Sequence, residues 1–323
     1  MGRLFVRALC IAILLLPLLF SAGCGGNTAD VVVREDTTAP PKQGAEEYNY
    51  KIYLITMDQA SNYWQHIDSG CRKAVREIGG IDYHWIAPVK NNIADQRECI
   101  DRAVESGAHA ILLSASSPTE LEGSLANATQ AGIKLIYVDS TATHEAIASL
   151  VTDNEAAGKT AGKIMQKALA EAGITKGTIG VATGNSWGKN AKPRYKGFQD
   201  AFEGTEFTVA PPVAMDGNRK NIEEEVATHP EYVAFFGANE QTTRIMSEQI
   251  QSMGRKQIII GFDTSDFTLS MIQQGIIYAT IQQNPERMGY EGVSIAVSAM
   301  KGEYAPSNAN EDMGVTVITR DKI

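Results

Sequence analysis

The chain has 323 residues, of which 43% are hydrophobic and 21% are charged. This is the composition of an ordinary globular protein, and the length exceeds what one hydrophobic core usually organises, so we expect two lobes. The formal net charge is −9, and the basic residues are scattered singly. Nucleic-acid binding is not expected, because it requires a basic stripe that replaces the counterions of the phosphate backbone.

The N-terminus has the pattern of an export signal. Arginines precede an apolar run over residues 8–20, which is shorter than the roughly 20 residues that span a bilayer. The run ends in Ser-Ala-Gly-Cys at 21–24, which resembles a bacterial lipobox with a serine in place of the usual aliphatic residue. We expect a signal peptide over 1–23 and a diacylglycerol group on Cys24 that anchors the protein to the membrane. The alternative is an uncleaved anchor helix that happens to contain a cysteine.

Residues 24–49 are predicted to form a flexible tether. The segment is poor in large apolar residues and contains Thr-Thr-Ala-Pro-Pro at 37–41. Such a segment cannot bury enough surface to offset its ordering entropy. A random coil of this length spans on the order of 25–30 Å, which would hold a folded domain clear of a membrane.

From residue 50 onward, short β-rich runs alternate with helical patterns in two series. The first series has predicted strands at 52–57, 83–86, 110–114, 134–138 and 150–152, and helices at 63–78, 93–106 and 119–131. The second has strands at 178–182, 207–213, 232–236, 258–261 and 277–281, and helices at 192–202, 222–228, 242–253 and 267–274. Repeated βαβ units predict parallel sheets with helices on both faces. The predicted fold class is therefore α/β, with two doubly wound parallel-sheet lobes.

Parallel α/β sheets bind ligands beyond the carboxyl ends of their strands. The residues at these ends combine aromatic rings with short polar side chains and a nearby arginine, and the candidates are Asn62, Tyr63, Trp64, Asp139, Arg194, Met215, Asn239, Asp263 and Gln283. Carbohydrates need such a mixture, because their C–H faces stack on rings while carboxylates, amides and guanidinium groups bind hydroxyl pairs. Two alternatives stay open. The two aspartates could be helix caps, and one of the adjacent rings could point into the core, although we expect at least one to face the cleft.

A hydrolase is the sharpest rival reading. Gly-Asn-Ser-Trp-Gly at 184–188 matches the nucleophile elbow, and Ser186, Asp216 and His229 follow in a permitted order. However, several residues intervene before the next helix, and His229 ends a helix at the amino edge of the sheet. That edge is opposite to Ser186, so the geometry argues against a catalytic triad.

The remaining motifs predict no chemistry. Ala-Gly-Lys-Thr at 157–160 resembles the end of a phosphate-binding loop, but it lies inside a predicted helix, where Gly158 and Gly162 are expected to allow close helix packing. The five histidines show no paired spacing and have no neighbouring cysteine, so no metal site is expected. Cys71 and Cys99 lie on helices predicted to cover opposite sheet faces, which favours two buried free thiols over a disulfide.

From about residue 50 to the C-terminus, the chain resembles the ribose- and galactose-type periplasmic binding proteins, which share their fold with the ligand domain of lactose-repressor-type regulators. The matching motifs are ordered along the whole domain: Asn-Tyr-Trp at 62–64, Val-Asp at 138–139, Thr-Asp-Asn at 152–154 with Gly158 and Gly162, Arg194 before Gly-Phe at 197–198, Asn-Glu at 239–240, Gly-Phe-Asp at 261–263, and Ala-Thr-Ile at 279–281 with Gln283 and Pro285.

The resemblance implies two lobes that close on a ligand like a hinged trap. The first lobe would comprise residues 50–152 plus 284–312, and the second 153–283 plus 313–323. Three crossovers would join them, with Asp153, Asn154 and Asn284 as hinge residues. In this family, the positions of Asp139, Arg194, Asn239, Asp263 and Gln283 hold ligand hydroxyls, and those of Tyr63 and Trp64 sandwich the sugar ring. No cofactor is implied.

Departures from the family pattern bear on the ligand. Ser140 stands where the ribose-binding proteins have an arginine, and Met57 and Met215 replace a small polar residue and an aromatic ring. The missing arginine would have bound two ligand oxygens at once, and the two methionines make the pocket more apolar. Both changes argue against ribose as the ligand. A deoxy sugar, hexose, polyol, nucleoside or furanose signal stays open.

The expected function is therefore that of a monomeric, extracytoplasmic solute-binding lipoprotein. It would capture a small sugar-like ligand and deliver it to the permease subunits of an ABC importer, without catalysing a reaction. A sensory lipoprotein that signals to a chemoreceptor or histidine kinase would use the same pocket and stays open. A transcription regulator is excluded, because a lipobox stands where a DNA-binding module would lie.

Overall fold

The computed structural model describes residues 31–34, 49–59, 61–184, 190–305 and 310–323. The expected signal peptide, the lipidation site at Cys24 and the elbow serine Ser186 lie outside these residues. Within them, no helix combines the length and the apolar character needed to cross a membrane.

The first lobe is a seven-stranded sheet between two helical layers. Its strand order is β1-β3-β2-β4-β5-β6-β13, and every pair except β1–β3 is parallel. Helices α1 and α9 pack on one face, and α2 and α3 on the other. The elements are β1 (Val31–Arg34), β2 (Tyr50–Ile55), α1 (Asn62–Ile78), β3 (Ile81–Pro88), α2 (Ile93–Glu105), β4 (Ala110–Leu113), α3 (Glu122–Gln130), β5 (Lys134–Val138), β6 (Ala148–Val151), α9 (Pro285–Met300) and β13 (Asn310–Asp312).

The second lobe repeats this three-layer arrangement. Its strand order is β14-β12-β11-β10-β7-β8, with β9 also paired to β7. Helices α4 and α5 cover one face, and α6, α7 and α8 the other. The elements are α4 (Asn154–Glu171), β7 (Gly177–Thr183), α5 (Ala191–Asp200), β8 (Phe207–Val209), β9 (Val213–Ala214), α6 (Arg219–Thr228), β10 (Ala234–Gly237), α7 (Glu240–Ser252), β11 (Ile258–Phe262), α8 (Asp266–Gln273), β12 (Ala279–Gln283), β14 (Val315–Thr319) and η1 (Arg320–Lys322).

One predicted strand is divided in two. The single strand expected over 207–213 is present as β8 and β9, which both pair with β7. Pro211 and Pro212 stand between them. Proline has no N–H group for the ladder, so continuous pairing stops there.

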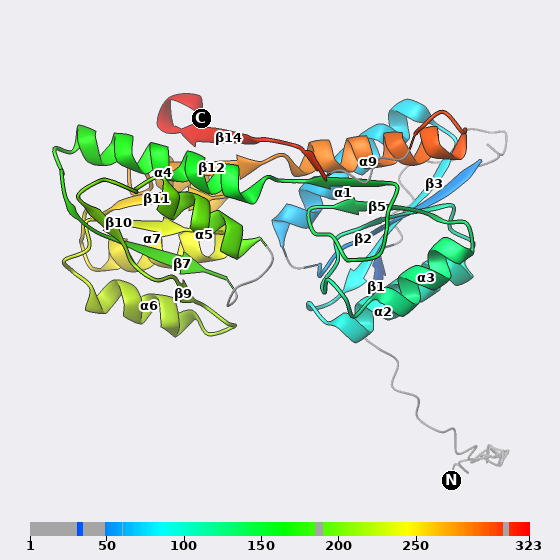
Figure 1. The fold of residues 1–323 in the computed structure, drawn as a ribbon, viewed down its shortest axis with the longest axis horizontal. Coiled ribbons are helices and arrows are strands. Elements are labelled where there is room, and N and C mark those ends of the chain that lie inside the picture. The colour runs from blue at the N-terminus through cyan, green and yellow to red at the C-terminus, as the bar shows by residue number, and fades with distance from the viewer. Residues whose placement is uncertain (1–30, 35–48, 60, 185–189, 306–309) are drawn as a thin grey trace, which may run out of the picture.

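The chain passes between the lobes three times, after β6, after β12 and after β13, and Figure 1 shows the three segments together on one side of the two lobes. Hydrogen bonds link the three segments to one another. Asp312 Oδ1 accepts bonds of 2.9 Å from the backbone N–H groups of both Asp153 and Gly314. Asn284 Nδ2 donates to the carbonyl oxygen of Met313 at 2.7 Å. Two of the expected hinge residues therefore tie the crossing segments into one unit.

Close helix pairs depend on glycine in both lobes. A Cβ atom on Gly158 of α4 would overlap the backbone oxygen of Arg194 in α5, and one on Gly197 would overlap the backbone oxygen of Glu155. Gly70 and Gly289 allow the same approach between α1 and α9. The predicted packing role of Gly158 is thus confirmed, and the Lys-Thr pair that follows it lies inside α4 rather than in a phosphate-binding loop.

The expected tether is not unstructured throughout, because residues 31–34 form β1. This strand pairs antiparallel with β3, with Val31 opposite Pro88 and Arg34 opposite Trp85. Three consecutive valines favour extended backbone. The pairing also covers the outer edge of β3, whose backbone groups would otherwise lack partners. The prediction of a fully flexible tether is wrong at this point, and most of the tether lies outside the described residues.

The two cysteines of the described chain are free and buried. Cys71 belongs to the core layer under α1 and α9, and Cys99 to the layer on the opposite face of the sheet. Burial raises the pKa of both thiols, that of Cys99 to about 12. The prediction of two buried free thiols is confirmed.

Candidate functional site

Two aspartates occupy equivalent positions in the two lobes. Asp139 directly follows β5 and Asp263 directly follows β11, and both have φ of 64°. Each backbone N–H donates to the neighbouring strand, Asp139 to Leu150 at 2.9 Å and Asp263 to Ile281 at 2.8 Å. Aspartate is one of the few residues with a side chain that tolerates this left-handed conformation.

Neither aspartate is a helix cap. Helix α8 is capped by Ser265, whose hydroxyl accepts from the N–H of Thr268, so Asp263 is not needed there. Asp139 is followed by a loop and then β6. The capping alternative is therefore wrong for both carboxylates.

Asp139 is held by hydroxyl donors from its own lobe. Its carboxylate accepts from Tyr63 Oη at 3.0 Å and from Ser140 Oγ at 2.7 Å, and the side chain is buried. Burial raises the pKa of Asp139, while the bonds from Ser140 and Tyr63 lower it. Burial and the charges of Asp139 and Asp263 raise the pKa of Tyr63 well above its ordinary value. Tyr63 thus stays protonated as a donor, close to carboxylates from both lobes.

Arg194 supplies a buried cation on which the charges of Asp263 and Asp139 both act. The residue is 4% exposed, and its guanidinium carbon lies 3.4 Å from the centroid of the Phe262 ring. It donates to Asn154 Oδ1 through Nε and Nη2 and to the carbonyl of Ala238 through Nη1. Burial lowers the pKa of Arg194, and the charge of Asp263 opposes that shift. Asn154, expected at the hinge, therefore also orients the site arginine.

Asp263 is paired with Gln283. Gln283 Nε2 donates to Asp263 Oδ1 at 2.9 Å, while the buried Oε1 of Gln283 has no hydrogen-bond partner in the described part of the chain. Burial raises the pKa of Asp263 to about 6, against the lowering effect of Arg194 and Gln283. Buried acceptors are nearly always satisfied, so Gln283 Oε1 is available to a ligand hydroxyl.

Asn190 joins the two lobes and was not predicted as a site residue. It lies immediately before α5 in the second lobe, and its Nδ2 donates to Ser140 Oγ at 3.2 Å and Asp139 Oδ2 at 3.5 Å in the first. It comes seven residues after the end of β7 and not directly after a strand, so the carboxyl-end rule did not select it. Its spacing of four residues from Arg194 was the available signal, because such residues share one helix face.

Other expected site residues lie elsewhere. Trp64 is 6% exposed in the core of the first lobe, and Met215 is 7% exposed in the core of the second. The structure therefore does not bring these two side chains into the cluster of polar groups around Asp139 and Asp263. Of the two adjacent rings, Tyr63 reaches the cluster and Trp64 does not. Asn239 caps α7, with Oδ1 accepting from the N–H of Thr242 at 2.9 Å. The side-chain nitrogen of Asn239 remains for other partners. Asn62 is exposed and lines a pocket between the lobes.

An open pocket of 470 Å³ lies between the lobes at the start of α1 and α7. We refer to it as the mouth pocket, and its lining residues are Asp58, Ser61, Asn62, Val89, Lys90, Asn91, Glu240, Gln241 and Arg244.

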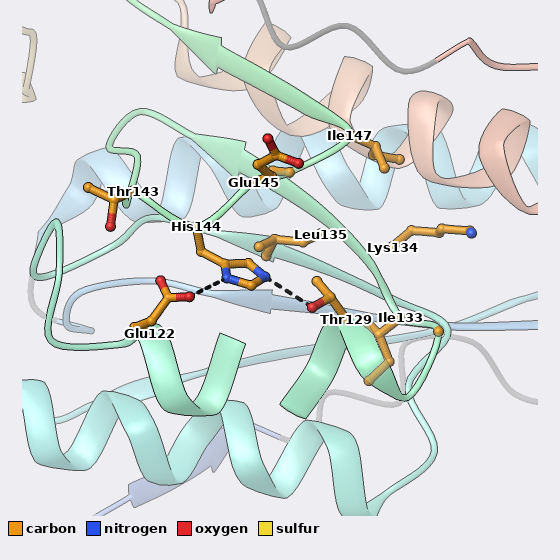
Figure 2. A pocket seen from close by; sticks show the side chains of 11 residues that line it. Glu122, Thr129, Ile133, Lys134, Leu135, Thr143, His144, Glu145 and Ile147 are labelled. Atoms are coloured by element: carbon orange, nitrogen blue, oxygen red, sulfur yellow. Dashed lines mark hydrogen bonds and ion pairs between the residues drawn. The ribbon is translucent and has the colours of Figure 1, made fainter. Parts of the chain in front are cut away.

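A second pocket, of 640 Å³, lies on the first lobe beside α3 and β5, and Figure 2 shows its lining side chains. His144 lies between Glu122 and Thr129, with ring nitrogens 2.8 and 3.0 Å from their oxygens. These three polar groups satisfy one another.

The proposed triad partners do not meet. His229 ends α6, stacks on Tyr232 at 4.3 Å and places Nδ1 2.9 Å from Glu231. Asp216 lies near the carboxyl end of β7, where its N–H donates to the carbonyl of Gly184. Helix α6 runs between Asp216 and His229, which is why the two lie at opposite ends of the lobe.

Known proteins share this arrangement. The sequence model of the family described as "Periplasmic binding protein domain" matches residues 52–304. The ribose import binding protein of Escherichia coli (strain K12) is 24% identical over 273 residues, which cover 82% of this chain and 90% of the relative. GanP, a glucose-galactose binding protein from Geobacillus stearothermophilus, is 26% identical with a TM-score of 0.73, covering 85% of this chain and 98% of its own. An ABC transporter solute binding protein from Agrobacterium vitis with bound D-fucose is 27% identical with a TM-score of 0.74, covering 84% and 96%. The predicted fold class is confirmed, and the chain belongs to the periplasmic binding protein family of the ribose- and galactose-binding type.

Proposed function

We propose that this protein captures a neutral sugar between its lobes. The observation that carries the proposal is the pair of carboxylates, the buried Asp139 and the half-buried Asp263, whose charges both act on the buried Arg194. Carboxylates accept bonds from adjacent hydroxyls while a guanidinium donates to others, which is the pattern that a polyol requires. The relatives named above for ribose, glucose-galactose and D-fucose support the same ligand class.

The corner around Ser140 favours a sugar other than ribose. Ser140 Oγ donates to Asp139 and accepts from Asn190, so a hydroxyl and an amide stand beside this carboxylate in place of the arginine of the ribose-binding proteins. A hydroxyl pair at this corner would lack a bidentate partner. We therefore expect a hexose, a pentose other than ribose, or a deoxy sugar to bind more tightly than ribose.

A thermal-shift screen of the purified full-length protein in detergent tests the ligand class. The panel contains D-ribose, D-arabinose, D-glucose, D-galactose, D-fucose, a nucleoside and a polyol. A sugar that binds the folded state at 100 times its Kd adds about 2.7 kcal/mol of stability and raises the melting temperature. Titration calorimetry then supplies the Kd. If no sugar shifts the melting temperature and a nucleoside does, the proposal is wrong.

We also propose that the protein is lipid-anchored through Cys24 and passes its ligand to the permease of an ABC importer. The apolar leader that ends in Ser-Ala-Gly-Cys supports the anchor, and the import functions in the relatives' names support the delivery. Cys24→Ala should abolish palmitate labelling and membrane partitioning while leaving ligand affinity unchanged. Labelling that persists in this variant would contradict the lipoprotein assignment.

The proposed role includes no chemistry on the ligand. The separation of Asp216 from His229 supports this view. After prolonged incubation with the protein, the sugar should show an unchanged NMR spectrum. Turnover that disappears in Ser186→Ala would show that the protein is an enzyme instead.

A further inference from the structure

The mouth pocket adjoins, on both lobes, the site around Asp139 and Asp263, which we call the inner site. On the first lobe, Asn62 lines the pocket and the next residue, Tyr63, reaches Asp139. On the second lobe, Glu240 lines it and lies close enough to Asp263 for its charge to act on that carboxylate. A ligand held by the two aspartates would therefore have the mouth pocket next to it. The pocket volume of 470 Å³ falls within the range of about 300–1,000 Å³ that is typical of small-molecule sites.

The charges of the mouth pocket balance. Asp58 and Glu240 provide two acids, and Lys90 and Arg244 provide two bases. An anionic group would need an excess of positive charge, as phosphate sites have. A balanced set of donors and acceptors suits a neutral group that both donates and accepts, and hydroxyls do both.

Several polar groups of the pocket are available to a ligand. In the parts of the chain that the structure describes, Lys90 and Gln241 make no side-chain hydrogen bond or ion pair, and both are exposed. Among the described residues, the side-chain amide of Asn91 donates a hydrogen bond only to the sulfur of Met57, at 3.8 Å. Arg244 donates through Nε to Glu248 at 2.9 Å and lies over the Phe267 ring, and within the described residues its terminal nitrogens make no hydrogen bond. Lys90 and Asn91 belong to the first lobe, and Gln241 and Arg244 to the second, so closure would bring both sets onto one group.

We propose that the mouth pocket is a second saccharide subsite, so that the protein takes a disaccharide or glycoside with one residue between Asp139 and Asp263 and the next among Asn91, Gln241 and Arg244. The inference rests on the proposed sugar-binding function of the inner site.

Titration calorimetry of the purified full-length protein tests the subsite with paired probes. The monosaccharides are D-galactose, D-glucose and L-arabinose, and the disaccharides are lactose, melibiose, maltose and arabinobiose. At least one disaccharide should bind tenfold or more tightly than either of its component sugars. Asn91→Ala and Gln241→Ala, one from each lobe, should reduce this gain threefold or more and leave monosaccharide affinity unchanged.

Matched control variants separate the subsite from general surface effects. Gln251→Ala removes an exposed glutamine from the same helix as Gln241, and Asn127→Ala removes an exposed asparagine from the first lobe. Neither residue lines the pocket, so neither variant should change the affinity for any probe.

The possible results distinguish the subsite from the inner site. If a monosaccharide binds and every disaccharide that contains it binds more weakly, the subsite is wrong and the sugar-binding function stands. If galactose 6-phosphate binds more tightly than galactose and the disaccharides do not, the pocket binds anions and the proposal is overturned. If no saccharide binds, the proposed function itself fails.

Discussion

Replacement of Asp263 by asparagine separates the binding role of this carboxylate from its effect on folding. Asparagine keeps the shape of aspartate and tolerates a φ of 64°. Its oxygen can still accept from Gln283, which now bonds Asp263 at 2.9 Å. The change therefore removes the negative charge and little else. A charge-assisted hydrogen bond contributes about 1.5–3 kcal/mol, so ligand affinity should fall roughly ten- to a hundredfold.

The stability of the ligand-free protein should change in the opposite direction. Burial raises the pKa of Asp263 from 3.8 to about 6, which means that the charged form is disfavoured in the fold. A shift of this size corresponds to at most about 3 kcal/mol, and solvent screening reduces it. Asp263→Asn should therefore melt at the same temperature as the wild type or higher. Loss of affinity without loss of stability is the expected signature.

Calorimetry at pH 7.5 supplies the affinity and differential scanning fluorimetry the melting temperature. Asp266→Asn is the matched control, because Asp266 is an exposed acid in the first turn of α8, three residues further on. It should change affinity less than about twofold, because weak surface charge effects reach only tenths of a kcal/mol. If Asp263→Asn binds like the control, or if it loses affinity only in proportion to a lower melting temperature, the assigned role of Asp263 is refuted.

Three further results are expected. Lowering the pH from 7.5 to 5 should protonate Asp263, so calorimetry should show weaker ligand binding. Over the same range the ligand-free fold should become more stable, because the raised pKa of Asp263 makes the folded state bind this proton more readily than the unfolded state does. Gly158→Ala should weaken ligand binding and lower the free energy of unfolding, measured by denaturant titration, by about 1–3 kcal/mol, because the added Cβ would overlap the backbone of Arg194. The control Gly123→Ala should be neutral or stabilising, because no atom lies within 4 Å of a Cβ at that position. Small-angle scattering should show a smaller radius of gyration with saturating sugar. Asn190→Ala should increase the radius of gyration of the ligand-free protein, because it removes hydrogen bonds between the lobes. An unchanged scattering profile in both experiments would contradict hinged closure.

The residues at the strand ends could be located from the sequence because buried parallel strands have a simple pattern. Such strands are covered on both faces, so they appear as continuous apolar runs. The predicted strand at 134–138 is β5 with the same bounds, and that at 258–261 is β11 without its last residue. Asp139 and Asp263 are the first residues after these runs, and the rule that ligands bind at the carboxyl ends then identified both as candidates.

The sequence by itself determined the two α/β lobes, the carboxylates at their facing edges, the buried thiols and the glycine-dependent helix pairs, because each depends on a local pattern of burial or backbone freedom. Only the tertiary structure decided which side chains meet across the cleft. Tyr63 and Trp64 are neighbours on α1, and the packing of that helix against α9 turns the first toward Asp139 and the second into the core. Asn190 and β1 were missed for the same reason. Their partners lie far away in the chain, and no local pattern encodes a contact whose other half is 50 or more residues distant.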